Sequence, residues 1–590
     1  MERITGLKRT GYCGTFRASD VGREITVYGW VQRQRNLGGL IFIDLRDRTG
    51  LLQLAFDENT DRAVFEKAAS VRSEYVLAAV GTVRERSAKT DKIATGDIEV
   101  FVTELRILAK SETTPFEIVE NSQTAETTRL KYRYLDLRRP DLQKNILLRS
   151  KIAKITRDYF YDNDFVEIET PILMKSTPEG ARDFLVPSRL HNGNFYALPQ
   201  SPQLYKQLSM VAGFDRYIQI ARCFRDEDLR ADRQPEFTQI DLEMSFVDVE
   251  DVLQMIEGYI KTLFKKALDV DITTPLPRLT FAEAMDRYGS DKPDTRFGME
   301  LYDLSETVKN SGFGVFDGAL AAGGTVRGFT AKNAVTALSR KEIDKLTEHA
   351  KGIGAKGLAW IRLTPDGIAS SFGKFVSEET MDAILKAANA ETGDVVLIVA
   401  DSKKTLALTV LGTLRNEVAK KLDIIKEGYN LLWIVEFPFF DWDEETQTWV
   451  AMHHPFTAPM DECLPYLETD KGAVRAKAYD LVLNGIELSS GSIRITDPAL
   501  QSRIFTLLGL SEEEAQLKFG YLLDAFRFGP PPHGGCALGL DRLVMQMIGA
   551  ESLRDVVAYP KLKDATEAMT ECPSPADRAQ LDLLGIQLKD

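Results

Sequence analysis

The alternating run at positions 236–244, in which polar and apolar residues alternate strictly from Gln239 to Met244, constrains the fold more than any other feature of the sequence. A period of two places successive side chains on opposite faces of a strand. The face suited to a core comprises Thr238, Ile240, Leu242 and Met244. The opposite face carries an aromatic ring, an amide and two carboxylates, from Phe237, Gln239, Asp241 and Glu243. With the strand-like segment 216–225 before it, this run predicts a hairpin whose polar face lines a pocket.

The residue types on that polar face suit a nucleotide and an amino group. Arg225 ends the partner strand and offers a planar guanidinium for a phosphate or a carboxylate. Phe237 offers a flat face for a base, and Asp241 and Glu243 offer carboxylates for an amine. The polar segment 225–234 favours a mobile loop over a ligand. The alternative is a charged loop between two surface strands, and the hairpin alone does not decide between them.

Three segments resemble the motifs of one enzyme family. FRDEDLRADRQPEFTQID, at residues 224–241, closely resembles motif 2 of the class II aminoacyl-tRNA synthetases, in the version of the bacterial-type aspartyl enzymes of subclass IIb. A predicted helix at 142–162, a strand and Thr170-Pro171 resemble motif 1; the alternative is an ordinary buried helix–strand pair. GPPPHGGCALGLDR, at 529–542, resembles motif 3 and is expected to open a helix that runs to residue 548. Ala537 and Asp541 vary the general motif 3 pattern.

The first 110 residues favour a small β domain. Five strand candidates, separated by turn signals, are expected at residues 25–31, 40–45, 51–56, 75–83 and 98–107. Five short strands suit an OB-type barrel that binds single-stranded nucleic acid. Phe42 alternates with Ile41 and Ile43, so it either stacks a base on the surface or belongs to the core. The resemblance implies that Arg35, Phe42 and Gln53 contact the tRNA anticodon.

The resemblance implies an α+β fold: an N-terminal OB-type β-barrel, a class II synthetase catalytic domain with an antiparallel sheet, and an inserted α+β domain. The expected parts are an anticodon-binding domain at 1–110, a linker or hinge at 111–140, a catalytic domain at 141–289 and 426–560, an insertion at 290–425 and a C-terminal tail at 561–590. The basic segment 129–139 either touches an RNA backbone or forms a solvated hinge, and we favour the hinge.

Further candidate site residues lie outside the hairpin. Pro202 is expected to open a helix capped by Ser201, with Gln203 and Lys206 about one turn apart. His453 and His454 point to opposite sides of an extended segment, so they do not ligate one metal together. Asp480 and Glu487 suit Mg²⁺ bound to triphosphate oxygens, and Arg494 can pair with a substrate carboxylate. Each of these has a plain alternative as a solvated or structural residue.

The family assigns roles to these positions. Its catalytic residues correspond to Arg225, Glu227 and Arg542. Its aspartate site corresponds to Glu179, Ser201, Gln203, Lys206, Arg225, Asp241, His453 and Arg494. Its ATP site corresponds to Arg225, Glu227, Gln234, Phe237, Glu487, Gly539, Asp541 and Arg542. Its metal ligands correspond to Asp480 and Glu487.

Composition excludes several other classes. No apolar run reaches the roughly 18 residues of a membrane span, and the N-terminus lacks an apolar signal core, which predicts a cytoplasmic protein. The five cysteines form no CxxC pair, which argues against a disulfide framework or a zinc ribbon. P-loop, dinucleotide-binding, zinc-protease and class I synthetase motifs are missing. The net charge is −14, but the first 50 residues carry nine basic and five acidic side chains, which allows a polyanion to bind there.

The function expected from the resemblance is ATP-dependent aspartylation of tRNA(Asp), with Mg²⁺, by a homodimer joined through motif 1 and without a membrane partner. Whether tRNA(Asn) is a second substrate stays open. Lysyl and asparaginyl enzymes of the same subclass are the nearest rivals, and paired cations at Lys206 and Arg494 argue against both. A non-catalytic RNA-binding paralogue is the rival of another class.

Overall fold

The computed structural model describes residues 1–177, 181–228 and 233–589. Its contacts group these residues into two compact units. The first contains Met1–Lys151, the segment that ends at Gln234, and Ile548–Gln580. The second contains Ile152–Asp228, Pro235–Met547 and the residues from Leu581 onward. In the described part of the chain no helix is both long enough and apolar enough to cross a membrane.

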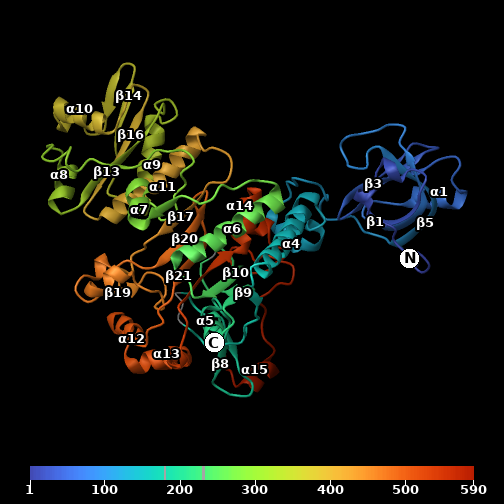
Figure 1. The fold of residues 1–590 in the computed structure, drawn as a ribbon. Coiled ribbons are helices and arrows are strands. Elements are labelled where there is room, and N and C mark those ends of the chain that lie inside the picture. Colours follow the sequence, from blue (N-terminus) through green and yellow to red (C-terminus); the bar gives the residue numbers. More distant parts are fainter. Residues whose placement is uncertain (178–180, 229–232, 590) are drawn as a thin grey trace. The chain divides into compact units, whose positions relative to one another are not determined.

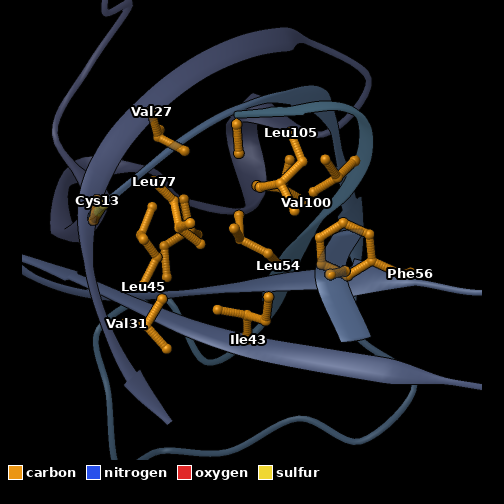
Figure 2. Close-up of a cluster of buried hydrophobic side chains, with 14 of the residues drawn as sticks. Cys13, Val27, Val31, Ile43, Leu45, Leu54, Phe56, Leu77, Val100 and Leu105 are labelled. Atoms are coloured by element: carbon orange, nitrogen blue, oxygen red, sulfur yellow. The ribbon is translucent and has the colours of Figure 1, made fainter. Parts of the chain in front are cut away.

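A closed five-stranded barrel forms most of the first unit, in the order β1-β2-β3-β5-β4. Its strands are β1 (Glu24–Asn36), β2 (Ile41–Asp47), β3 (Gly50–Phe56), β4 (Val76–Glu85) and β5 (Ile98–Ala109), with helix α1 at Arg62–Ser70. Inward-facing residues such as Val27, Leu45, Leu54, Leu77 and Val100 fill the interior (Figure 2). All five expected strands are present, because alternation marks a strand with one buried face.

The rest of the first unit includes α2 (Glu126–Lys131), α3 (Arg133–Asp136) and the first part of α4 (Pro140–Tyr161). Here the favoured solvated hinge at 129–139 is wrong. Arg133 is 3% exposed and donates hydrogen bonds to the carbonyls of Arg554, Val557 and Ala558. Arg133 and Arg139 both form ion pairs with the fully buried Asp136. These two arginines therefore form internal hydrogen bonds and ion pairs, because a buried charge needs a partner.

An eight-stranded sheet is the scaffold of the second unit, in the order β11-β17-β20-β21-β22-β10-β9-β6. Its strands are β6 (Val166–Glu167), β9 (Arg216–Phe224), β10 (Glu236–Ser245), β11 (Arg278–Thr280), β17 (Leu431–Val435), β20 (Ala478–Leu483), β21 (Ile486–Ile493) and β22 (His533–Gly539). The pairs from β17 to β9 are antiparallel. The associated helices are α5 (Gln203–Val211), α6 (Val249–Leu268), α7 (Phe281–Tyr288) and α14 (Leu540–Ile548).

The motif 3 glycines form a strand, which corrects the prediction that they open a helix. Gly534 and Gly535 lie in β22, between β21 and β10, and α14 begins only at Leu540. A Cβ atom on Gly535 would lie 2.1 Å from the Leu242 carbonyl oxygen and 2.3 Å from Oε2 of Glu243. These glycines therefore let β22 approach β10 closely.

The segment from 302 to 401 forms its own five-stranded sheet, in the order β12-β13-β16-β14-β15 (Figure 1). The strands are β12 (Tyr302–Asp303), β13 (Thr325–Ala331), β14 (Ala359–Thr364), β15 (Gly367–Ser370) and β16 (Val395–Asp401). Helices α9 (Arg340–Ile353) and α11 (Lys404–Leu422) share one apolar cluster with the sheet. Helices α8 (Gly314–Ala321) and α10 (Glu378–Ala387) share another. The two clusters sandwich the sheet between helices.

Smaller elements complete the chain. Two hairpins pair β7 (Leu185–Pro187) with β8 (Phe195–Ala197), and β18 (Phe440–Asp443) with β19 (Thr448–Ala451). The remaining α-helices are α12 (Pro498–Leu507), α13 (Glu512–Ala525) and α15 (Arg578–Leu584). Short 3-10 helices occur at Cys13–Thr15, Ala18–Asp20, Gly373–Phe375, Asp461–Tyr466, Lys471–Ala473, Phe526–Phe528 and Leu553–Asp555.

Candidate active site

The predicted hairpin is formed by β9 and β10, with Phe237 opposite Cys223 and Asp241 opposite Gln219. Arg225 follows β9 directly, and its amide donates a 2.8 Å hydrogen bond to the carbonyl of Pro235. Its guanidinium carbon lies 5.1 Å from the centroid of the Phe237 ring. Within the described residues, the buried Nε of Arg225 makes no hydrogen bond. The ring and the guanidinium therefore form one stacked unit with donor capacity left for a ligand.

Four charged side chains meet beneath the polar face of β10. Nζ of Lys206, on α5, lies 2.9 Å from Oδ1 of Asp241 and 3.3 Å from Oε2 of Glu243. Arg494, just beyond β21, donates to both oxygens of Glu243, at 2.9 and 3.1 Å. None of these side chains is more than 2% exposed. The cluster is neutral overall, because two cations meet two carboxylates.

The two carboxyl groups respond differently to this environment. Burial outweighs the attraction of Lys206 at Asp241 and raises the pKa of that carboxyl above its usual range. Burial also acts on Glu243, but Arg494 and Lys206 together reverse it and lower the pKa of Glu243. Glu243 is thus held as the anion that joins the two cations. Sequence reasoning assigned Glu243 no site role beyond a possible amine contact, although its alternation with Asp241 was visible.

The two adjacent histidines take different positions, as an extended segment requires. Nε2 of His454 lies 2.6 Å from Nη1 of Arg494 and accepts its hydrogen, because a guanidinium only donates. Burial and the charge of Arg494 lower the pKa of His454 well below its usual range. Burial lowers the pKa of the predicted site residue His453 to about 4. Its Nε2 makes no hydrogen bond to the described residues.

Asp480 and Glu487 lie on neighbouring strands, β20 and β21, where Glu487 pairs with Val482 beside a β-bulge. Burial, followed by the repulsion of Glu487, raises the pKa of Asp480 well above its usual range. These two carboxyl groups repel each other, and the buried Oδ1 of Asp480 has no hydrogen bond to the described residues. Both properties fit a site for a divalent cation whose other ligands would be phosphate and water.

The first side chains of α14, the helix that follows β22, contact neighbouring strands of the eight-stranded sheet. Asp541 is 3% exposed, and its Oδ2 accepts a 2.9 Å hydrogen bond from the amide of Thr238 on β10. Nη1 of Arg542 lies 3.3 Å from the carbonyl oxygen of Glu487. Gly539 ends β22 opposite Gln239. The structure thus brings Phe237, Glu487 and Arg542 to one region, with Asp541 anchoring the helix.

The other predicted residues occupy varied positions. The Ser201 hydroxyl accepts a 3.3 Å hydrogen bond from the amide of Gln203, although the residue at the cap of α5 is Pro202. Glu227 is half-buried. Gln234 belongs to the first unit, where its amide group exchanges hydrogen bonds with the backbone of Lys561. Glu179 lies outside the described residues.

On the barrel, the three predicted anticodon residues are neighbours. Phe42 is half-buried on β2 and points away from the core that Ile41 and Ile43 join, so the core alternative is wrong. Nη2 of Arg35 lies 2.9 Å from Oε1 of Gln53, and its guanidinium carbon lies 5.5 Å from the Phe42 ring centroid.

Arg86 and Glu99, which sequence reasoning missed, extend this polar network. Arg86 donates a 2.9 Å hydrogen bond to Gln53, and Gln53 donates a 2.6 Å hydrogen bond to Glu99. Both are on other strands or loops of the barrel, and no local spacing indicates that they meet.

A model of the tRNA synthetases of class II (D, K and N) matches residues 125–563, and a model of the OB-fold nucleic acid binding domain matches residues 25–108. The chain belongs to the class II tRNA synthetases. It is 58% identical to an aspartate–tRNA ligase of Ruminiclostridium cellulolyticum, over 100% of this chain and 99% of that relative. It is 57% identical to an aspartate–tRNA(Asp/Asn) ligase of Lachnoclostridium phytofermentans, over 100% and 98%.

Solved structures of class II synthetases share the fold. Asparaginyl-tRNA synthetase from Pyrococcus horikoshii, complexed with asparaginyl-adenylate, matches with a TM-score of 0.59 at 18% identity, over 94% of this chain and 98% of that one. A putative aspartyl-tRNA synthetase from Leishmania major matches with a TM-score of 0.59 at 19% identity, over 95% of each chain. The expected family and the expected α+β fold are therefore confirmed.

Proposed function

We propose that this class II synthetase is an aspartate–tRNA ligase, which activates L-aspartate with ATP and transfers it to the 3′ end of tRNA(Asp). The buried pair of cations, Lys206 and Arg494, is the observation that carries the choice of amino acid. The substrate's side-chain carboxylate would bind between them. Asp241 and Glu243 already balance the charges of the two cations, so the choice depends on hydrogen bonding: a carboxylate offers an acceptor oxygen to each cation. The amide of asparagine has one oxygen and would turn its NH₂ group toward the other cation, and the ammonium of lysine would be repelled.

The rest of the site suits the formation of an adenylate. The α-carboxylate of aspartate attacks the α-phosphorus of ATP, and pyrophosphate leaves. Arg225 is in position to offset the negative charge that develops on the phosphate, while Phe237 stacks on adenine. Glu227, Gly539 and Arg542 are assigned to the nucleotide, with Asp541 as the anchor of α14. The family resemblance alone assigns Gln234 to the nucleotide. Positioning and electrostatics would supply most of the rate enhancement.

Recognition of the ammonium group is assigned to Ser201, Gln203 and Asp241, together with His453. The family resemblance alone adds Glu179, which lies outside the described residues. At neutral pH, His453 would act as a neutral hydrogen-bonding group, since its pKa of about 4 leaves it uncharged. Asp480 and Glu487 would hold Mg²⁺, which supplies positive charge to the phosphates when it is bound.

The macromolecular partners are part of the same proposal. Arg35, Phe42 and Gln53 would contact anticodon bases, and tRNA(Asn) stays open as a second substrate. A homodimer through the motif 1 segment is supported by exposed apolar side chains there, namely Tyr161, Val166, Ile172 and Leu173. The proposal includes a cytoplasmic location, where the tRNA pool is charged.

ATP–pyrophosphate exchange, with aspartate, asparagine and lysine offered separately, tests the proposal. Exchange is expected with aspartate alone and is expected to be abolished in Arg225→Ala. Arg222→Ala is the matched control, because Arg222 lies three residues before Arg225, on β9, and forms a half-exposed ion pair with Glu236. Near-normal exchange in Arg225→Ala would refute the assignment. Exchange with no amino acid, even with tRNA added, would favour a non-catalytic paralogue.

A further inference from the structure

A cavity of about 550 Å³ lies within the segment 290–425, separate from the candidate active site. It is open to solvent on one side and is lined by the loop 297–302, the end of β13, the residues after α10 and the end of α11. Its volume falls in the range of small-molecule sites. Neither the proposed aminoacylation reaction nor the family membership gives this cavity a role.

One wall is held rigid by a buried arginine. Arg415, on α11, is 1% exposed and donates to the carbonyl oxygens of Asp294, Gly298 and Met299, at 2.8, 2.6 and 3.0 Å. Its guanidinium carbon lies 4.1 Å from the Phe297 ring centroid. Arg415 therefore fixes both the loop backbone and the aromatic ring that it presents to the cavity. A wall built in this way is preformed rather than dependent on a ligand.

The remaining apolar lining comes from Tyr302, Leu422 and Ile424. The hydroxyl of Tyr302 lies 2.8 Å from that of Thr330, which also donates to the carbonyl of Ala388 at 2.8 Å. These groups satisfy one another, so they present a fixed surface rather than open donors. Rings and aliphatic chains on such a surface suit a flat, apolar-faced ligand.

The charged groups of the cavity are already paired. Glu300 forms two hydrogen bonds with Arg287, at 2.7 and 2.9 Å. Lys332 lies 2.8 Å from Oδ2 of Asp394. The site therefore offers no net charge that would select a simple cation or anion.

Two side-chain amides supply the specific polar contacts. Asn333 and Asn389 both line the cavity, and both have left-handed backbone conformations, with φ of 52° and 45°. Both side chains are exposed, and neither amide makes a hydrogen bond to the described residues, so their donors and acceptors face solvent and are accessible to a ligand. An amide presents a donor and an acceptor side by side, which matches the edge of a purine base.

We propose that this cavity binds a purine nucleotide, with its base against Phe297 and its edge read by Asn333 and Asn389. The ligand that carries this base is either a free mononucleotide or an RNA with an unpaired purine, and both offer the cavity the same base. The site would be distinct from the nucleotide site at Phe237.

Photolabelling of the full-length protein with 8-azido-AMP, followed by peptide mapping, tests the proposal because it reads the location directly. Adducts are expected within 297–302 or 422–424, in addition to any near Phe237. In Asn333→Gly/Asn389→Gly, which keeps the left-handed backbone and removes both amides, labelling of the cavity should fall at least about tenfold. Asn310→Gly is the matched control, since Asn310 has φ of 59° and lies outside the cavity.

Competition separates the two sources of the base. Protection of the cavity peptides by unmodified AMP indicates a free nucleotide, and protection by a tRNA transcript but not by AMP indicates an RNA base. Adducts confined to other peptides, or cavity labelling that is unchanged in the double variant, would overturn the proposal. Asn389→Gly alone, expected to give a partial loss, keeps the test decisive if the double variant unfolds.

Discussion

Glu243→Gln is the substitution for which the structure predicts the largest and most specific effect. Glutamine has the same shape but no charge, so the change leaves Lys206, Arg494 and Asp241 buried with an excess positive charge. Three contacts of 2.9 to 3.3 Å lose their ionic partner. Removing one member of a buried ion pair costs roughly 3–5 kcal/mol of unfolding free energy. We also expect a raised KM for aspartate, because Glu243 orients both cations.

Scanning calorimetry of both proteins measures the stability effect, and a fall of several degrees in the thermal midpoint is expected. Glu236→Gln is the matched control on the same strand. Its carboxylate is 2.7 Å from Arg222, but the two side chains are 31% and 36% exposed, so the expected cost is below about 1 kcal/mol. The reasoning is refuted if the two substitutions lower the midpoint equally.

The pH dependence gives a second check on the same substitution. The pKa of Glu243 is lowered in the folded protein, so its stabilising contribution is present above the unfolded value of about 4.3. It is lost as the pH falls through the lowered folded value. The difference between the wild type and Glu243→Gln should therefore be full at pH 7 and shrink below about pH 4. A difference that grows in acid would contradict this linkage.

Three other substitutions separate the parts of the proposed reaction. Phe237→Ala should raise the KM for ATP roughly tenfold, since base stacking on an aromatic ring is worth about 1–3 kcal/mol; an unchanged KM in exchange kinetics would show that adenine binds elsewhere. Phe42→Ala should lower kcat/KM for tRNA by a similar factor and leave ATP–pyrophosphate exchange unaltered. Asp480→Asn should raise the Mg²⁺ concentration needed for half-maximal exchange, and a superimposable Mg²⁺ titration would remove Asp480 from the metal site.

Most of the fold was predictable because it depends on local patterns. Alternation between buried and exposed positions located the barrel strands and the β9–β10 hairpin to within a few residues. Asn484-Gly485, between β20 and β21, is a local turn signal of the same kind, and both residues have the left-handed backbone that such a turn requires. The prediction for motif 3 was wrong because it interpreted the glycines as the start of a helix. In β22 glycine instead removes side chains where strands approach closely.

The hydrogen bonds and ion pairs within the site were less predictable, because they join residues far apart in the chain. Glu243 and Arg494 are 251 positions apart. No local period reveals such a pair. The same reason explains His454, which contacts Arg494, while the sequence argument selected its neighbour. The segment that contains Arg133 was expected to be a solvated hinge, because the distant carbonyl groups that accept its hydrogen bonds cannot be recognised from the sequence.

The pairing of β10 with β22 has a consequence for synthesis on the ribosome. Gln239 lies opposite Gly539, which is 300 residues later in the chain. Strands β10 and β22 can therefore pair only when synthesis is nearly complete. At about 5–20 residues per second, the exposed edge of β10 waits roughly 15–60 s for its partner. In that interval the segment that forms the five-stranded sheet can fold first and leave β10 as an open edge. A chain released before β22 is made would lack the proposed nucleotide site and would leave a strand edge available to other chains.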